Sequence, residues 1–130
     1  TDPASITGKF RAMGFGLKAL LLILIIACIK TALSEEILFR GFVAKRLIGV
    51  LGFQKGNIIQ AVIFGAIHTA LFSAISSNVA FLVLIFVVPA IGAYVSCYLN
   101  EKIGNGRILP GWISHGLANI IAYSVVGFII

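Results

Sequence analysis

The stretch that decides the fold is residues 17–47, LKALLLILIIACIKTALSEEILFRGFVAKRL. It opens with a run of aliphatic side chains and keeps a helical pattern of apolar residues to its end. A helix over this stretch would be about 45 Å long, which exceeds the hydrocarbon core of a bilayer. No small-residue cleavage site follows the apolar run, so we interpret it as a membrane helix and not as a signal peptide.

The composition of the whole chain supports a membrane environment. Of its 130 residues 60% are hydrophobic and 11% are charged, and the mean hydropathy is +1.11. An ordinary soluble domain has about a quarter of its residues charged, and a domain of this size cannot bury so much apolar surface. A water-soluble globule is therefore excluded. Cys28 and Cys97 each lie inside an apolar run, where their spacing indicates neither a disulfide framework nor a zinc knuckle.

Three further segments have the length and apolarity of membrane helices, and they are residues 57–75, 79–100 and 110–130. Residues 48–56, which contain three glycines and Lys55, are expected to form a turn-rich, basic loop. The predicted fold class is all-α, a polytopic transmembrane helical bundle of about four spanning helices. We interpret residues 17–130 as its core domain and residues 1–16 as a basic lead-in or the remainder of a truncated N-terminal region.

The net charge of +6 comes from cations placed singly at the ends of the apolar runs. This arrangement is typical of membrane anchoring and not of nucleic-acid binding. One face of the bundle is expected to hold Lys9, Arg11 and Lys18, and the opposite face Lys45, Arg46, Lys55, Lys102 and Arg107. The larger positive charge favours a cytoplasmic location for the second face. We expect a multi-pass protein of a bacterial cell membrane, with membrane lipid as a partner and no nucleic acid.

Several polar residues lie within the predicted helices, and they are Lys30, Glu35, Glu36, Arg40, His68, His115 and Asn119. Each of the charged ones would cost about 2 to 3 kcal/mol or more in mid-membrane if it had no partner. So many in one small domain indicate that they face one another around a polar site.

Their spacing suggests how such a site is divided. Glu36 and Arg40 are four residues apart in the order that favours an ion pair on a helix. Glu35 points about 100° away from Glu36 and lacks that partner, which suits a general base or acid. His115 and Asn119 have the same four-residue spacing, so both can project from one helix face as hydrogen-bond donors.

Helix rise gives the depth of three of these groups below the face that carries the basic loop. By this estimate Glu35, His68 and His115 lie about 18, 16 and 8 Å below that face. Tilted helices could bring these depths into register. We therefore predict one cluster beneath the membrane surface, open to water through the polar interior of the bundle.

Three motifs follow one another on successive helices: E-E-x-x-x-R at residues 35–40, F-x-x-x-H at 64–68 and H-x-x-x-N at 115–119. In this order they resemble the CAAX protease and bacteriocin-processing family, also called the Abi family, whose eukaryotic relatives are the type II CAAX prenyl endopeptidases. The resemblance covers roughly residues 17–123, and the three motifs in register are specific where one alone would be weak.

The resemblance implies an intramembrane glutamate-type endopeptidase that needs no metal and acts on a membrane-presented peptide or protein. It implies that Glu35 activates a water with help from His68. His115 and Asn119 would then form an oxyanion hole, a role in which each donor contributes about 2.7 to 4 kcal/mol. The pair of Glu36 and Arg40 would have a structural or substrate-orienting role.

The residues alone leave other interpretations open. Two histidines and a carboxylate could bind zinc, although H-E-x-x-H is absent and the spacing does not favour a tetrahedral site. The same cluster could recognise a peptide without cutting it, in a bacteriocin-immunity protein or a scaffold subunit of a larger membrane complex. Intramembrane carboxylates and histidines also serve proton or ion pathways. Neither the substrate nor the oligomeric state follows from the sequence.

Overall fold

The computed structural model describes residues 3–129, except the side chains at positions 127 and 129. Every regular element within this range is a helix, so the predicted all-α class is confirmed. Three of the helices are long and apolar enough to cross a membrane: Leu17–Leu51, Phe53–Ser73 and Val79–Ile103. Together with the composition, they identify the chain as an integral membrane protein.

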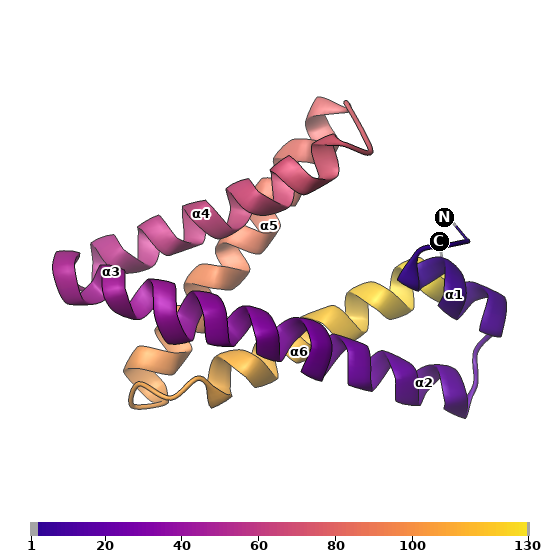
Figure 1. The fold of residues 1–130 in the computed structure, drawn as a ribbon, viewed down its shortest axis with the longest axis horizontal. Helices are drawn as coiled ribbons and strands as arrows, with labels where there is room; N and C mark the ends of the chain where they lie inside the picture. The colour runs from indigo at the N-terminus through magenta and orange to yellow at the C-terminus, as the bar shows by residue number, and fades with distance from the viewer. Residues whose placement is uncertain (1–2, 130) are drawn as a thin grey trace. The chain divides into compact units, whose positions relative to one another are not determined.

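Several helices contain π-helical turns, which are labelled η (Figure 1). In chain order the elements are α1 (Ile6–Met13), α2 (Leu17–Leu24), η1 (Ile25–Leu33), η2 (Glu36–Val43), α3 (Ala44–Leu51), α4 (Phe53–Ser73), α5 (Val79–Tyr98), η3 (Leu99–Ile103), α6 (Leu109–Ser124) and η4 (Val125–Ile129). The fourth expected segment therefore corresponds to α6, which has 16 residues and continues into η4.

The prediction of a loop over residues 48–56 is wrong in its length, because only Gly52 interrupts the helices there. Gly52 has a φ of 86°, a left-handed conformation that glycine adopts without steric cost. Gly56 lies inside α4, where an added Cβ would come within 2.6 Å of the backbone nitrogen of Ile48. Gly52 and Gly56 thus allow a sharp turn and a close return of α4 along α3.

Helices α4 and α5 lie side by side as a hairpin (Figure 1). Gly65 permits this contact, because a Cβ there would meet the carbonyl oxygen of Phe86 at 2.7 Å. Two fully buried carboxamides also join the helices. Gln60 donates to the carbonyl oxygen of Ala93 at 3.0 Å, and Asn57 donates to that of Tyr94 at 3.2 Å. Such interhelical hydrogen bonds satisfy polar groups where no water reaches.

The chain divides into two compact units. The first comprises residues 1–35 and 112–130, and the second comprises residues 36–111. In the first unit the lead-in forms helix α1, which begins where the Ser5 hydroxyl accepts a hydrogen bond from the Gly8 N–H. Phe10 of α1 is buried, with its ring 6.3 Å from that of Tyr123 on α6. The division into a lead-in and a core domain stays a prediction.

Candidate active site

The first unit brings Glu35 and His115 together. Glu35 follows η1 in the first spanning helix, and His115 lies on α6. Oε2 of Glu35 is 3.3 Å from Nε2 of His115, and the two side chains are 27% and 13% exposed. This Oε2 atom is buried and accepts no hydrogen bond from the described residues. A carboxylate oxygen that accepts no hydrogen bond keeps its lone pairs available. Beside an imidazole, such an oxygen can accept a proton from a bound water.

Two side chains on either side of His115 hold α6 against η1. Trp112 donates its indole N–H to the carbonyl oxygen of Cys28 at 2.6 Å, and Asn119 donates to that of Ala27 at 3.2 Å. Trp112 lies three residues before His115 and Asn119 four residues after it, so both share its helix face. These bonds set the position of His115 relative to Glu35.

Asn119 therefore has a partner that sequence reasoning did not anticipate. A carboxamide nitrogen carries two hydrogens, and one of them is used by the carbonyl oxygen of Ala27. The second remains available to a substrate oxygen. The role of Trp112 beside His115 was also missed, although its i,i+3 spacing to the histidine was a usable signal.

The second unit holds Glu36 and Arg40 as the expected i,i+4 ion pair. Nε of Arg40 donates to Oε1 of Glu36 at 2.9 Å, and Nη2 donates to the same oxygen. The side chains are 0% and 2% exposed, so the pair is fully buried. The guanidinium also lies 4.6 Å from the ring centroid of Phe64 on α4. Burial of a charge requires such partners, and here they lie on both η2 and α4.

Asn100 completes this buried cluster and was not identified from the sequence. Its Nδ2 donates to Oε2 of Glu36 at 3.3 Å, and its Oδ1 accepts from the backbone N–H of Gly111 at 2.7 Å. A Cβ at Gly111 would meet Oε2 of Glu36 at 2.8 Å, so only glycine fits without displacement. In the sequence, Asn100 is simply a polar residue at the end of an apolar segment, a common position for loop-forming residues.

His68 also lies in the second unit, on α4, where it is partly buried. Its Nδ1 is 2.8 Å from the carbonyl oxygen of Phe64, one turn earlier in the same helix. A carbonyl can only accept, so Nδ1 carries the proton. In the neutral imidazole Nε2 then keeps a lone pair and can act as a base or as an acceptor.

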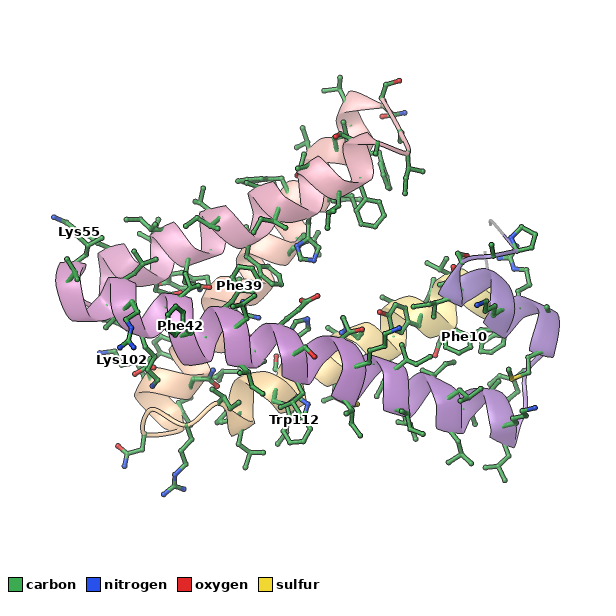
Figure 2. The ribbon with its side chains drawn as sticks, viewed as in Figure 1. Phe10, Phe39, Phe42, Lys55, Lys102 and Trp112 are labelled. Carbon is green, nitrogen blue, oxygen red and sulfur yellow. The ribbon has the colours of Figure 1, made fainter. Side chains whose placement is uncertain are left out.

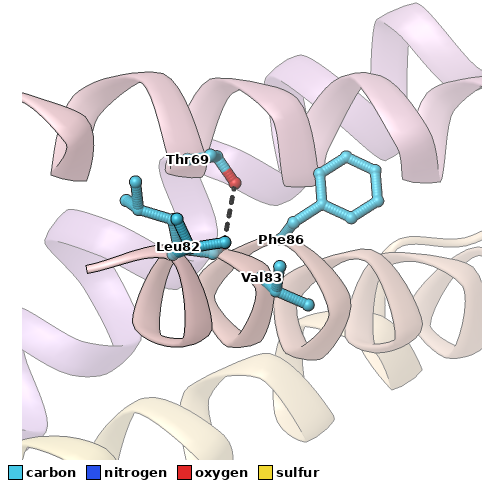
Figure 3. A pocket seen from close by; sticks show the side chains of 5 residues that line it. Thr69, Leu82, Val83 and Phe86 are labelled. Atoms are coloured by element: carbon cyan, nitrogen blue, oxygen red, sulfur yellow. Dashed lines mark hydrogen bonds between the residues drawn. The ribbon is translucent and has the colours of Figure 1, made fainter. Parts of the chain in front are cut away.

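Two grooves in the surface are lined by apolar side chains. One, of about 260 Å³, lies between α4 and α5 and is lined by Thr69, Val79, Leu82, Val83 and Phe86 (Figure 3). The other, of about 210 Å³, is lined by Cys28 and by residues of α6, namely Trp112, Ile113, Gly116, Leu117 and Ile120. Neither of these grooves is lined by the polar residues of the predicted site.

The described residues contain no group of three His, Cys, Asp or Glu side chains placed to hold a metal ion. Within them, the acid and imidazole of the first unit form a pair, and the second unit holds the buried ion pair with Asn100.

The fold and these polar groups define an integral membrane protein whose helices carry acid, imidazole and carboxamide side chains away from water. A family model described as type II CAAX prenyl endopeptidase Rce1-like matches residues 17–121. The chain belongs to this family of membrane endopeptidases, and the resemblance seen in the three motifs is confirmed. No curated protein and no solved structure matches the chain significantly.

Proposed function

We propose that the chain is an intramembrane glutamate-type endopeptidase that hydrolyses a peptide bond of a membrane-presented peptide or protein. The observation that carries the proposal is the close approach of Glu35 and His115, with Oε2 of Glu35 left able to bind a water. Family membership supports a peptide substrate and a membrane setting. We propose that it works in a bacterial cell membrane.

Glu35 acts as the general base. Its carboxylate takes a proton from water, and the water oxygen forms a bond to the carbonyl carbon of the substrate, with His68 assisting the proton transfer. The tetrahedral intermediate then collapses. The C–N bond breaks and the departing amine receives the proton that Glu35 had taken.

His115 and Asn119 stabilise the negative charge that develops on the carbonyl oxygen. The second hydrogen on Nδ2 of Asn119 and an imidazole N–H of His115 are the donors. The backbone carbonyls of Ala27 and Cys28 fix α6 through Asn119 and Trp112, so these donors are oriented before substrate binds. Glu36 and Arg40 keep a structural or orienting role, because both are buried within their own unit.

No step of this reaction requires a metal. Glu35 activates the attacking water, which a metal ion would otherwise do, and the oxyanion donors supply the charge stabilisation.

The proposal is tested by incubating the purified chain in detergent micelles with a library of fluorogenic peptides, with and without a chelator. We expect cleavage that survives the chelator and falls by about 100-fold or more in Glu35→Gln and His68→Ala. Glu101→Gln is the matched control, because that carboxylate pairs with Lys45 on the second unit. Full activity of both site variants would contradict the proposal. Loss of activity with the chelator would instead favour a zinc site.

The same variants separate the alternatives. In a scaffold or immunity protein, Glu35→Gln should leave the biological activity intact, and a partner subunit should copurify with the chain. In an ion pathway, the parent chain should conduct protons in liposomes and cleave no peptide. Glu35→Gln should then abolish the proton flux.

A further inference from the structure

Each of the three candidate membrane spans has one of its ends in the second unit, and these three ends lie close together. Helix α3 ends at Leu51, α4 begins at Phe53 and η3 ends at Ile103. Contacts join these ends, since Nζ of Lys45 lies 2.6 Å from Oε1 of Glu101 and Nζ of Lys102 lies 4.3 Å from the ring centroid of Phe53. Because three spans end here, this end lies at the level of the lipid headgroups.

Positive charge gathers at this end without matching negative charge. Arg46, Lys55, Lys102 and Arg107 are exposed, and we call these four residues the basic rim. The nearby carboxylate of Glu101 is already bound by Lys45, which also donates to the carbonyl oxygen of Gly106 at 2.6 Å. None of the four rim residues forms an ion pair with another described residue. At the other end of the α4–α5 hairpin, residues 74–78 (AISSN) carry no charge.

Aromatic rings lie beneath two of these cations. The guanidinium of Arg46 is 5.0 Å from the ring centroid of Phe42, and Lys102 lies over Phe53. The rings of Phe53 and Tyr98 are themselves 6.3 Å apart. Figure 2 shows Phe42, Lys55 and Lys102 gathered at this end of the unit. Long cationic side chains above aromatic rings are typical of the membrane interface, where the apolar stem is buried and the charge reaches the headgroups.

We propose that the basic rim binds the phosphate groups of anionic phospholipids in the adjoining leaflet. Guanidinium and ammonium groups are the usual partners of phosphate, and Arg can bind it through two parallel hydrogen bonds. Each basic residue near an anionic membrane surface strengthens binding by roughly fivefold. The inference does not depend on peptidase activity, so it can fail or hold independently of the proposed function.

The test measures lipid selectivity directly. The chain is reconstituted in phosphatidylcholine bilayers, and the association of spin-labelled phosphatidylglycerol is compared with that of spin-labelled phosphatidylcholine by electron spin resonance. We expect a preference for phosphatidylglycerol, which weakens by up to about 25-fold in a Lys55→Gln, Arg107→Gln double variant. A Lys9→Gln, Lys18→Gln variant changes the net charge equally in the first unit and should keep the preference.

Two further measurements serve as controls for charge and for folding. The charge-preserving double variant Lys55→Arg, Arg107→Lys should retain the preference, and circular dichroism should show the same helix content in every variant. The proposal is overturned if the parent chain shows no preference or if the Lys9→Gln, Lys18→Gln variant loses as much as the rim variant. It is also overturned if inorganic phosphate, at matched ionic strength with chloride, abolishes the preference, because the rim would then bind soluble phosphate.

Discussion

Asn100 donates a hydrogen bond to Oε2 of Glu36 at 3.3 Å, across 64 positions of sequence. Glu36 thus has Arg40 on one carboxylate oxygen and Asn100 on the other, in an interior that water does not reach. An ionised carboxylate is stable there only if its charge and its lone pairs both have partners. Asn100 also accepts from the Gly111 N–H, so one carboxamide connects η2 to the residue that precedes Trp112.

Asn100→Ala should destabilise the protein by about 1 to 3 kcal/mol, because Glu36 loses a donor and the Gly111 N–H loses its acceptor. Reversible denaturant unfolding in micelles, followed by circular dichroism, measures the change. Asn105→Gly is the control, since Asn105 is exposed and has a φ of 59° that glycine tolerates. Equal effects of the two substitutions would refute the buried role of Asn100.

Gly111→Ala should be more disruptive than its size suggests. The new Cβ would lie 2.6 Å from Oδ1 of Asn100 and 2.8 Å from Oε2 of Glu36, two atoms fixed by hydrogen bonds. Overpacking of this kind costs about 1 to 3 kcal/mol. Gly49→Ala is the matched control, because Gly49 lies in α3 with no atom within 4 Å of an added Cβ. There the alanine should be neutral or stabilising, and a lower midpoint for Gly49→Ala would contradict this.

The buried pair of Glu36 and Arg40 can be tested with a double-mutant cycle. Arg40→Met leaves an uncompensated buried carboxylate and should cost about 3 to 5 kcal/mol. In the double variant Glu36→Gln, Arg40→Met no charge remains, so we expect much of that loss to be recovered. The unfolding free energies of the two single variants and the double variant give the coupling. Additive losses would show that the two charges do not stabilise each other.

The sequence was sufficient for features that depend on local spacing. The first and third spans were placed within a few residues of their observed ends, because long apolar runs must be helical in a bilayer. The ion pair of Glu36 and Arg40 followed from helix geometry alone. The π-helical form of η1 and η2 was not foreseen, since hydrophobic periodicity does not distinguish the wider turn from an α-helical one.

The missed side-chain partners depend on contacts between distant segments. Nothing near Asn100 in the sequence identifies Glu36 as its partner, and nothing near Trp112 identifies the carbonyl oxygen of Cys28, 84 positions away. Gly56 was misinterpreted because its role also depends on a contact between two helices. A glycine in a loop and a glycine at a close helix contact look alike until the neighbouring helix, here with Ile48, is known.

Trp112→Phe tests whether the contact to η1 positions His115. The variant keeps an aromatic ring but removes the N–H that donates to Cys28 at 2.6 Å, so α6 loses one of the two bonds that flank the histidine. We expect a loss of about 1 kcal/mol in stability and a fall in kcat of up to about tenfold, with KM little changed. The reason is that oxyanion donors act on the transition state and not on the bound substrate.

The control for Trp112→Phe is Tyr98→Phe, which also removes one polar group from an aromatic side chain. Tyr98 is exposed on α5, so this variant should leave both kcat and stability unchanged. If Trp112→Phe raises KM while kcat stays constant, the indole contributes to substrate binding and not to the placement of His115.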